Sequence, residues 1–181
     1  LFPDDLKIWP YDPEAANALL DEGGWVDTDG DGIREASDGT PFAVHYISTT
    51  GAEMRPQIGQ IFADNLQECG IAVTASYLPA NEYFAAGPEG PVFGRRFDLA
   101  EFAWLTATTP PCHLWFSKNI TGPEAEGFGG WDNFNNTGWH HAQFDEQCRL
   151  ALAALPGSPA QVAAHQNALR IFVEELPVVP L

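Results

Sequence analysis

A strand, a helix and a second strand follow one another between residues 42 and 77, and this order restricts the fold more than any other feature. Apolar residues at 42, 44, 46 and 47 predict the first strand, and alternation over 71–77 predicts the second. Helical periodicity over 53–69 separates them, with Gly70 at its end. The apolar face of this helix is expected to comprise Ile58, Ile61, Phe62, Leu66 and Cys69. Two strands joined through a helix form a right-handed parallel crossover, so the sequence predicts an α/β fold.

A third strand is predicted at 97–105, where an almost continuous apolar run indicates burial on both faces. The run is followed by threonines and two consecutive prolines, which cannot continue a central strand because proline has no N–H to donate. Ligands of open α/β sheets bind outside the carboxyl ends of the strands, so Trp104, Thr106 and Thr108 are candidates for a binding mouth. The alternative interpretation is a buried tryptophan followed by a polar turn.

Helices are predicted before and after these strands in the sequence. One is expected to begin at Pro13, because the side chain of Asp12 can cap its free N–H groups. Two more are expected near the C-terminus, at 144–155 and at 159–176, and Ser158 opens a capping box for the second. The apolar stripe of the 144–155 helix is expected to comprise Phe144, Cys148, Ala151, Leu152 and Leu155.

The long stretch 106–141 is rich in aromatic residues, Gly and Asn, and it has little periodicity. A loop of this length within a compact domain is usually functional. Its aromatic rings are expected to line either a ligand surface or a small separate core. At the C-terminus, 177–181 is extended and apolar, which favours a sheet that continues in sequence outside this chain.

The segment DTDGDGIREASD at 27–38 has the oxygen-donor spacing of a calcium-binding loop, with Gly at the sixth position for the tight bend. The donors would be the carboxylates or carbonyls of Asp27, Asp29, Asp31, Ile33, Glu35 and Asp38. The residues that follow alternate like a strand, so the loop is not an EF-hand. Two interpretations remain open, a structural calcium ion and an acidic, Gly-rich turn that reverses the chain.

The three cysteines allow one disulfide. Cys69 falls on the apolar stripe of a helix and is expected to be a buried free thiol, so the predicted pair is Cys112 with Cys148. No two cysteines have the C-x-x-C spacing of a zinc or redox site.

The chain is strongly acidic, with 25 Asp and Glu against 8 Lys and Arg and a formal net charge of −17. Such a charge repels phosphate backbones, so no nucleic-acid partner is expected. The sequence has no apolar run long enough to predict a membrane span. It also lacks the H-E-x-x-H and G-x-S-x-G motifs, so nothing specific supports a secreted hydrolase.

The order of these segments resembles the C-terminal lobe of the family 5 extracellular solute-binding proteins, which serve bacterial ABC importers of oligopeptides and dipeptides. YDPEAANALL at 11–20 and DTDGDGIRE at 27–35 are similar to the family's opening block. FDLAEFAW at 97–104 is similar to its "FDxxxxGW", and LPVVPL at 176–181 to its closing "LPxIPL". The likeness extends over essentially the whole chain.

The resemblance implies one lobe of a two-lobed periplasmic-binding-protein type II fold, a mixed sheet flanked by helices, with 1–181 as that single lobe. It implies capture of a small solute between two lobes, with peptide favoured and sugar or chelate as alternatives. No catalysis and no required cofactor are implied, apart from the structural calcium ion considered above. The implied partners are membrane permease subunits. A monomer is expected in the periplasm or on the outer face of the cytoplasmic membrane, where a lipid on the missing N-terminal part could anchor it.

The resemblance also implies which residues face the ligand. By position they are Trp104, Thr106, Thr108, Trp131 and Asn133, the last two in a segment similar to the family's "GGxN". Ala107 stands where peptide-binding members can carry an acidic residue for the peptide's ammonium group, so the solute class stays open. The alternative from another class is a calcium-stabilised carbohydrate-binding or adhesion module, which would also use exposed aromatic rings and an acidic loop.

Overall fold

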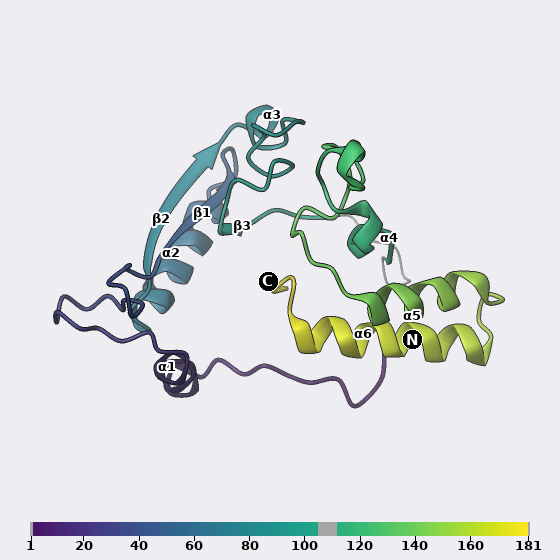
Figure 1. The fold of residues 1–181 in the computed structure, drawn as a ribbon, viewed down its shortest axis with the longest axis horizontal. Helices are drawn as coiled ribbons and strands as arrows, with labels where there is room; N and C mark the ends of the chain where they lie inside the picture. Colours follow the sequence, from purple (N-terminus) through teal and green to yellow (C-terminus); the bar gives the residue numbers. More distant parts are fainter. Residues whose placement is uncertain (1, 105–111, 181) are drawn as a thin grey trace. The chain divides into compact units, whose positions relative to one another are not determined.

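The computed structural model describes residues 2–104 and 112–180. The chain divides into two compact units, coloured by sequence in Figure 1. The sheet unit comprises Pro10–Phe84 and Arg96–Ala103, and the helical unit comprises Leu1–Trp9, Ala85–Arg95 and Trp104–Leu181. The expectation that 1–181 forms a single lobe is not tested by this division and stays a prediction.

Three parallel strands form the centre of the sheet unit. β1 (Ala43–Thr49), β2 (Ala72–Leu78) and β3 (Leu99–Ala100) lie in the order β2-β1-β3. β1 pairs with β2 along its whole length, and α2 (Met54–Gln67) connects them, so the predicted parallel crossover is confirmed. All pairs between these strands are parallel, and the antiparallel pairing among the described residues is confined to isolated bridges. The α/β fold class is therefore confirmed. A mixed sheet was expected, and the three described strands of the sheet are all parallel.

Helix α2 packs against one face of the sheet through its one buried residue, Gly59. A Cβ atom at this position would clash with the hydroxyl of Tyr77 and lie 3.0 Å from the ring of Tyr46, so the glycine allows close approach of helix and sheet. Ile61, predicted to lie on the buried face, is 61% exposed. It lies two positions from Gly59, which is more than half a turn around the helix, so it points away from the sheet.

The third strand is shorter and less buried than the sequence predicts. β3 contains two residues instead of the nine of 97–105, and it lies at an edge of the sheet rather than at its centre. Before the strand begins, the side chain of Asp98 accepts the backbone N–H of His45 at 2.7 Å, which occupies a donor of β1. The continuous apolar run indicated burial on both faces, but the described residues of 97–104 are half-buried or exposed.

Helix α1 (Pro13–Glu22) begins as predicted, because Asp12 Oδ1 accepts the N–H of Ala15 at 2.9 Å. None of its residues is buried, and Arg34 attaches it to the rest of the sheet unit. The guanidinium group has a side-chain exposure of only 13%. Its acceptors are Asn17 Oδ1, Asp21 Oδ1 and the backbone oxygens of Trp25 and Cys69. One arginine therefore ties α1, the acidic loop and the end of α2 together.

Helices α5 (Ala142–Ala153) and α6 (Pro159–Glu175) form an antiparallel pair in the helical unit (Figure 1). The predicted cap of α6 is confirmed, since Ser158 Oγ accepts the N–H of Gln161 at 3.2 Å. Leu152 and Leu155 were expected on the buried stripe of α5, but they are 65% and 79% exposed. The buried positions at 144, 148 and 151 follow one helix face, and Leu152 lies beyond its edge while Leu155 follows the end of the helix.

The described part of the aromatic stretch, 112–141, folds into short helices that supply a core. These are α4 (Cys112–Trp115) and the 3-10 helices η1 (Ser117–Asn119) and η2 (Glu124–Glu126). The buried cluster comprises Cys112, Leu114, Trp115, Phe116, Phe144, Cys148 and Ala168. The small-core interpretation is therefore confirmed for Trp115, Phe116 and Trp139.

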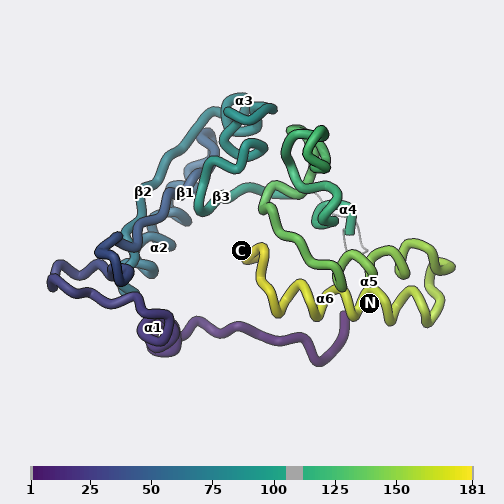
Figure 2. Tube along the Cα trace, viewed as in Figure 1, coloured from purple at the N-terminus to yellow at the C-terminus, as the bar shows by residue number. Residues whose placement is uncertain are grey.

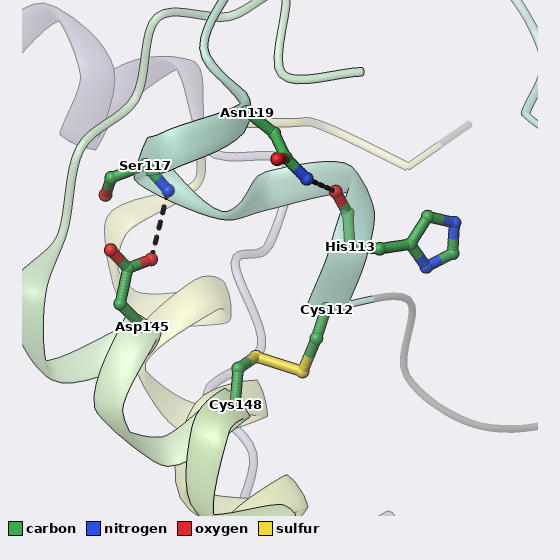
Figure 3. Close-up of a disulfide and its surroundings, with 6 residues drawn as sticks. All are labelled: Cys112, His113, Ser117, Asn119, Asp145 and Cys148. Atoms are coloured by element: carbon green, nitrogen blue, oxygen red, sulfur yellow. Dashed lines mark hydrogen bonds between the residues drawn. A yellow bond between two sulfur atoms is a disulfide. The ribbon is translucent and has the colours of Figure 1, made fainter. Parts of the chain in front are cut away.

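A disulfide crosses this core from α4 to α5 (Figure 3). It joins Cys112 to Cys148, whose Cα atoms lie 5.7 Å apart, and this is the predicted pair. Cys69, in the sheet unit, is a buried free thiol, also as predicted. The peptide N–H of Ser117 donates to Asp145 Oδ1 at 3.0 Å, which adds a second link between this stretch and α5.

The N-terminal segment lies beside α6, as Figure 2 shows. Asp5 pairs with Arg170 at 2.8 Å, and Lys7 pairs with Glu174 at 2.9 Å. Next to them, the indole N–H of Trp9 donates to the carbonyl of Val173 at 2.8 Å. Over residues 2–104 and 112–180, no helix combines the length and the apolar character that a membrane span needs.

Candidate ligand-binding site

Trp104 lies where the chain enters the helical unit. Its side chain is half-buried and packs against the core cluster of that unit, and its ring lies 6.1 Å from the ring of Phe134. Trp104 therefore lies between the core cluster and the exposed ring of Phe134, and its role as a ligand contact stays a prediction. Thr106 and Thr108, the other candidates from this segment, lie outside the described residues.

Trp131 and Asn133 are both half-buried in the turn that precedes Phe134. The amide of Asn133 is used within this turn, because its Nδ2 donates to the carbonyl of Gly129 at 2.6 Å and its Oδ1 accepts the N–H of Phe134 at 2.8 Å. Asn133 therefore shapes the turn, and only its remaining hydrogen-bonding capacity would be left for a ligand.

Glu101, directly beyond β3, gathers polar groups at the carboxyl ends of the strands. Its Oε1 accepts a hydrogen bond from Arg55 Nη1 at 2.6 Å, and the side-chain exposures of the pair are 13% for Glu101 and 20% for Arg55. The hydroxyl of the fully buried Ser48 donates to the same carboxylate. Nothing in the sequence predicts this cluster, because a single Glu in an apolar run gives no local signal of its partners.

Two buried tyrosines complete the Glu101 cluster. Tyr46 Oη donates to Glu101 Oε2 at 3.2 Å, and Tyr83 Oη donates to the backbone oxygen of Glu101 at 3.1 Å. Burial raises the pKa of both phenols, and the nearby Glu101 carboxylate raises it further. Both tyrosines therefore stay protonated and act as donors, which holds Glu101 within the sheet unit.

The acidic loop brings together four of its six predicted donors. One carboxylate oxygen each from Asp27, Asp29, Asp31 and Glu35 lies within 4.8 Å of the others. Ligands on opposite sides of a calcium ion are about 4.6–5.2 Å apart, because each Ca–O distance is about 2.3–2.6 Å. The spacing of these oxygens therefore fits calcium.

The two remaining predicted donors are Ile33 and Asp38. The backbone N–H of Ile33 donates to Asp31 Oδ1 at 2.8 Å, which leaves its carbonyl as the expected donor. Asp38 lies outside the group of four, because its Oδ1 accepts the N–H of Thr40 at 3.0 Å and so closes the next turn. The buried Glu35 accepts both the N–H and the hydroxyl of Thr28, at 2.8 and 2.7 Å, which holds the loop closed.

Comparisons with known proteins agree with this architecture. The chain is 26% identical over 181 residues to the "Di/tripeptide-binding protein 2" of Pseudomonas aeruginosa, covering 99% of this chain and 30% of that protein. It superposes with a TM-score of 0.82 and 26% identity on the oligopeptide-binding protein from Thermus thermophilus complexed with a pentapeptide, covering 99% of this chain and 31% of that one. A mannohexaose-bound periplasmic oligopeptide-binding protein from Thermotoga maritima has a TM-score of 0.78 at 22% identity, with coverages of 96% and 31%.

The chain thus spans about a third of the length of these relatives. The matches favour the solute-binding class over the carbohydrate-binding or adhesion module considered as the alternative. Residues 2–122 match the profile of the family described as "Bacterial extracellular solute-binding proteins, family 5 Middle". Since this match covers well over half of the chain, the chain belongs to family 5 of the bacterial extracellular solute-binding proteins.

Proposed function

We propose that the protein containing this chain captures a short peptide outside the cytoplasm and delivers it to the permease subunits of an ABC importer. One observation carries the proposal: the described fold superposes with a TM-score of 0.82 on an oligopeptide-binding protein complexed with a pentapeptide. The chain covers 31% of that protein, so it would supply part of the binding surface, and the rest would come from sequence outside it. The function is binding and release, without catalysis.

Within this chain we assign the ligand contacts to the segment that follows β3 and to the turn before Phe134. The residues are Trp104, Thr106, Thr108, Trp131 and Asn133. An aromatic face buries the apolar part of a solute, and hydroxyl and amide groups fix its orientation through hydrogen bonds. Ala107 offers no carboxylate to a peptide's ammonium group, so that charge would be held elsewhere in the protein. Sugars and metal chelates are the alternative solutes.

The location and assembly follow from the same proposal. A protein that collects solutes for an importer works in the periplasm or on the outer face of the cytoplasmic membrane, where a lipid anchor would retain it. The net charge of −17 on this chain disfavours adsorption of its own surface to anionic lipid. We expect the free protein to be a monomer that meets the permease subunits in transport.

The proposal predicts that the full-length protein co-purifies with a small molecule. Native mass spectrometry, before and after mild unfolding, should detect a mass difference that disappears on unfolding, and the released compound should be a peptide. Stripped protein should then be stabilised in a thermal melt by at least one peptide from a panel of two to five residues, because a ligand that binds only the folded state raises its stability.

A released sugar or chelate would keep the binding function and replace the peptide as its solute. An empty protein that none of the peptides, sugars or chelates stabilises would count against the solute-binding proposal as a whole.

We further propose that the acidic loop holds a structural calcium ion. Calcium at 1 mM should raise the melting temperature of a domain of this size by roughly 5–10 °C relative to EDTA, if the dissociation constant is about 10 μM. Asp29→Asn should reduce this shift, since it removes a negative charge from the group of four but keeps an oxygen that can accept the N–H of Asp31 and still ligate calcium. Asp38→Asn is the matched control and should keep most of the shift, because Asp38 lies outside the group of four. Equal melting temperatures in calcium and EDTA would contradict the site.

A further inference from the structure

Three aromatic rings from distant parts of the sequence meet on the helical unit. The ring of Phe134 lies 6.1 Å from that of Trp104 and 5.6 Å from that of His113, at interplanar angles of 68° and 88°. Phe134 is 43% exposed, His113 is exposed and Trp104 is half-buried. In the sequence, Trp104 and His113 border 105–111, the segment that carries two of the predicted ligand contacts. We call these three residues the aromatic subsite.

Phe134 is exposed although the residues on both sides of it are held by hydrogen bonds. Asn133 bonds within the turn, to Gly129 at 2.6 Å and to the N–H of Phe134 at 2.8 Å. Asn135 is fully buried, and its Nδ2 lies 2.9–3.2 Å from three backbone carbonyl oxygens. The exposed phenyl ring is therefore presented on a backbone held by side-chain hydrogen bonds.

His113 is presented in a similar way. It follows Cys112, which the disulfide holds to α5, and its backbone oxygen accepts a hydrogen bond from Asn119 Nδ2 at 2.6 Å. Figure 3 shows its imidazole ring pointing away from the disulfide and from the Ser117–Asp145 hydrogen bond. Both exposed rings of the subsite thus belong to rigid backbone, which lowers the entropy that a ligand would otherwise lose in ordering them.

We propose that the aromatic subsite binds an apolar side chain, aromatic or large aliphatic, of the captured peptide. This inference rests on the proposed function and adds a specificity to it. None of the three side chains is a carboxylate or a permanent cation, so they favour an uncharged group. Neighbouring rings meet at steep angles, so they form a corner instead of one flat platform, and a corner suits a compact side chain better than the flat face of a sugar. Burying such a side chain against them removes apolar surface from water on both partners.

The test compares peptide binding by the full-length protein and its Phe134→Ala variant, after bound solute has been removed by unfolding and refolding. Isothermal titration calorimetry would use trialanine and the three tripeptides in which one alanine is replaced by phenylalanine. The wild type should bind at least one phenylalanine peptide about tenfold more tightly than trialanine. In Phe134→Ala this preference should fall to about threefold or less, with trialanine binding little changed, and His113→Ala should lose part of it.

Phe2→Ala is the matched control, because Phe2 belongs to the same unit, is 68% exposed and lies outside the aromatic subsite. It should keep the full preference. If Phe134→Ala melts at a lower temperature than the wild type, Phe134→Leu takes its place, and the preference for phenylalanine must still fall.

The outcomes separate the two proposals. A wild type that binds peptides with no preference for phenylalanine, or a Phe134 variant that keeps the preference, would overturn the subsite and leave peptide capture intact. A wild type that binds none of these peptides but is stabilised by a sugar or chelate would overturn peptide capture, and the peptide subsite with it.

Discussion

The double variant Cys112→Ala/Cys148→Ala should be less stable than the wild type by about 4 kcal/mol. The bonded cysteines are 36 residues apart. Closing a loop of that length lowers the conformational entropy of the unfolded chain, which raises its free energy by about 4 kcal/mol. Both cysteines are buried in the core of the helical unit, at 4% and 0% exposure. Urea titration would measure the change as a lower midpoint.

The free thiol provides a matched control for this disulfide. Cys69→Ala also removes a buried sulfur atom but breaks no cross-link, so we expect a loss of about 1 kcal/mol from the small cavity. Reductant added during urea titration should lower the stability of the wild type towards that of the double variant and leave the double variant unchanged. A double variant no less stable than Cys69→Ala would show that the bond does not stabilise the fold.

Much of the local structure could be predicted because its causes lie within a few residues. Asp12 and Ser158 cap helices whose first residues are prolines, and the structure begins both helices there. Even the capping box differs in one detail, since Gln161 Oε1 accepts the N–H of Gly157 and not that of Ser158. Start signals of this kind are short-range, so a single sequence is sufficient to find them.

The errors arise where burial depends on distant segments. The apolar run at 97–105 looked like a central strand, yet it pairs on one side only and forms two residues of strand. Ile61 and Leu152 belong to apolar stripes but are exposed, because periodicity gives the width of a stripe and not the part that a neighbour covers.

The residues now proposed for the ligand site could be found only in part from the sequence, for the same reason. The family's sequence blocks pointed to Trp104, Trp131 and Asn133, which lie in two short segments. They did not indicate Phe134 or His113, because the three rings of the aromatic subsite come from positions 104, 113 and 134 and share no periodicity. For the acidic loop, four of the six predicted donors do lie close together, while calcium binding itself stays a prediction.

Asn135→Ala is expected to lower the free energy of unfolding by about 3 kcal/mol. The side chain is fully buried, and its Nδ2 lies 3.1, 3.2 and 2.9 Å from the carbonyl oxygens of Trp115, Phe116 and Trp139. Its Oδ1 accepts the hydroxyl of Thr137 at 2.9 Å. Alanine would leave these buried partners without Asn135, and each lost hydrogen bond of this kind is worth about 1 kcal/mol or more.

Asn167→Ala is the control for this prediction, because Asn167 belongs to the same unit but is exposed, with hydrogen bonds only to surface side chains. It should change stability by less than about 0.5 kcal/mol. Urea titration would measure both changes in stability. The substitution of Asn135 should also affect peptide binding, since Asn135 holds the backbone next to Phe134. Under mild conditions where Asn135→Ala stays folded, it should weaken the preference for phenylalanine peptides although the Asn135 side chain is not one of the three rings of the subsite. If it lost stability but kept the full preference, the rigid turn would matter to the fold alone, and the subsite would depend on its three rings without that support.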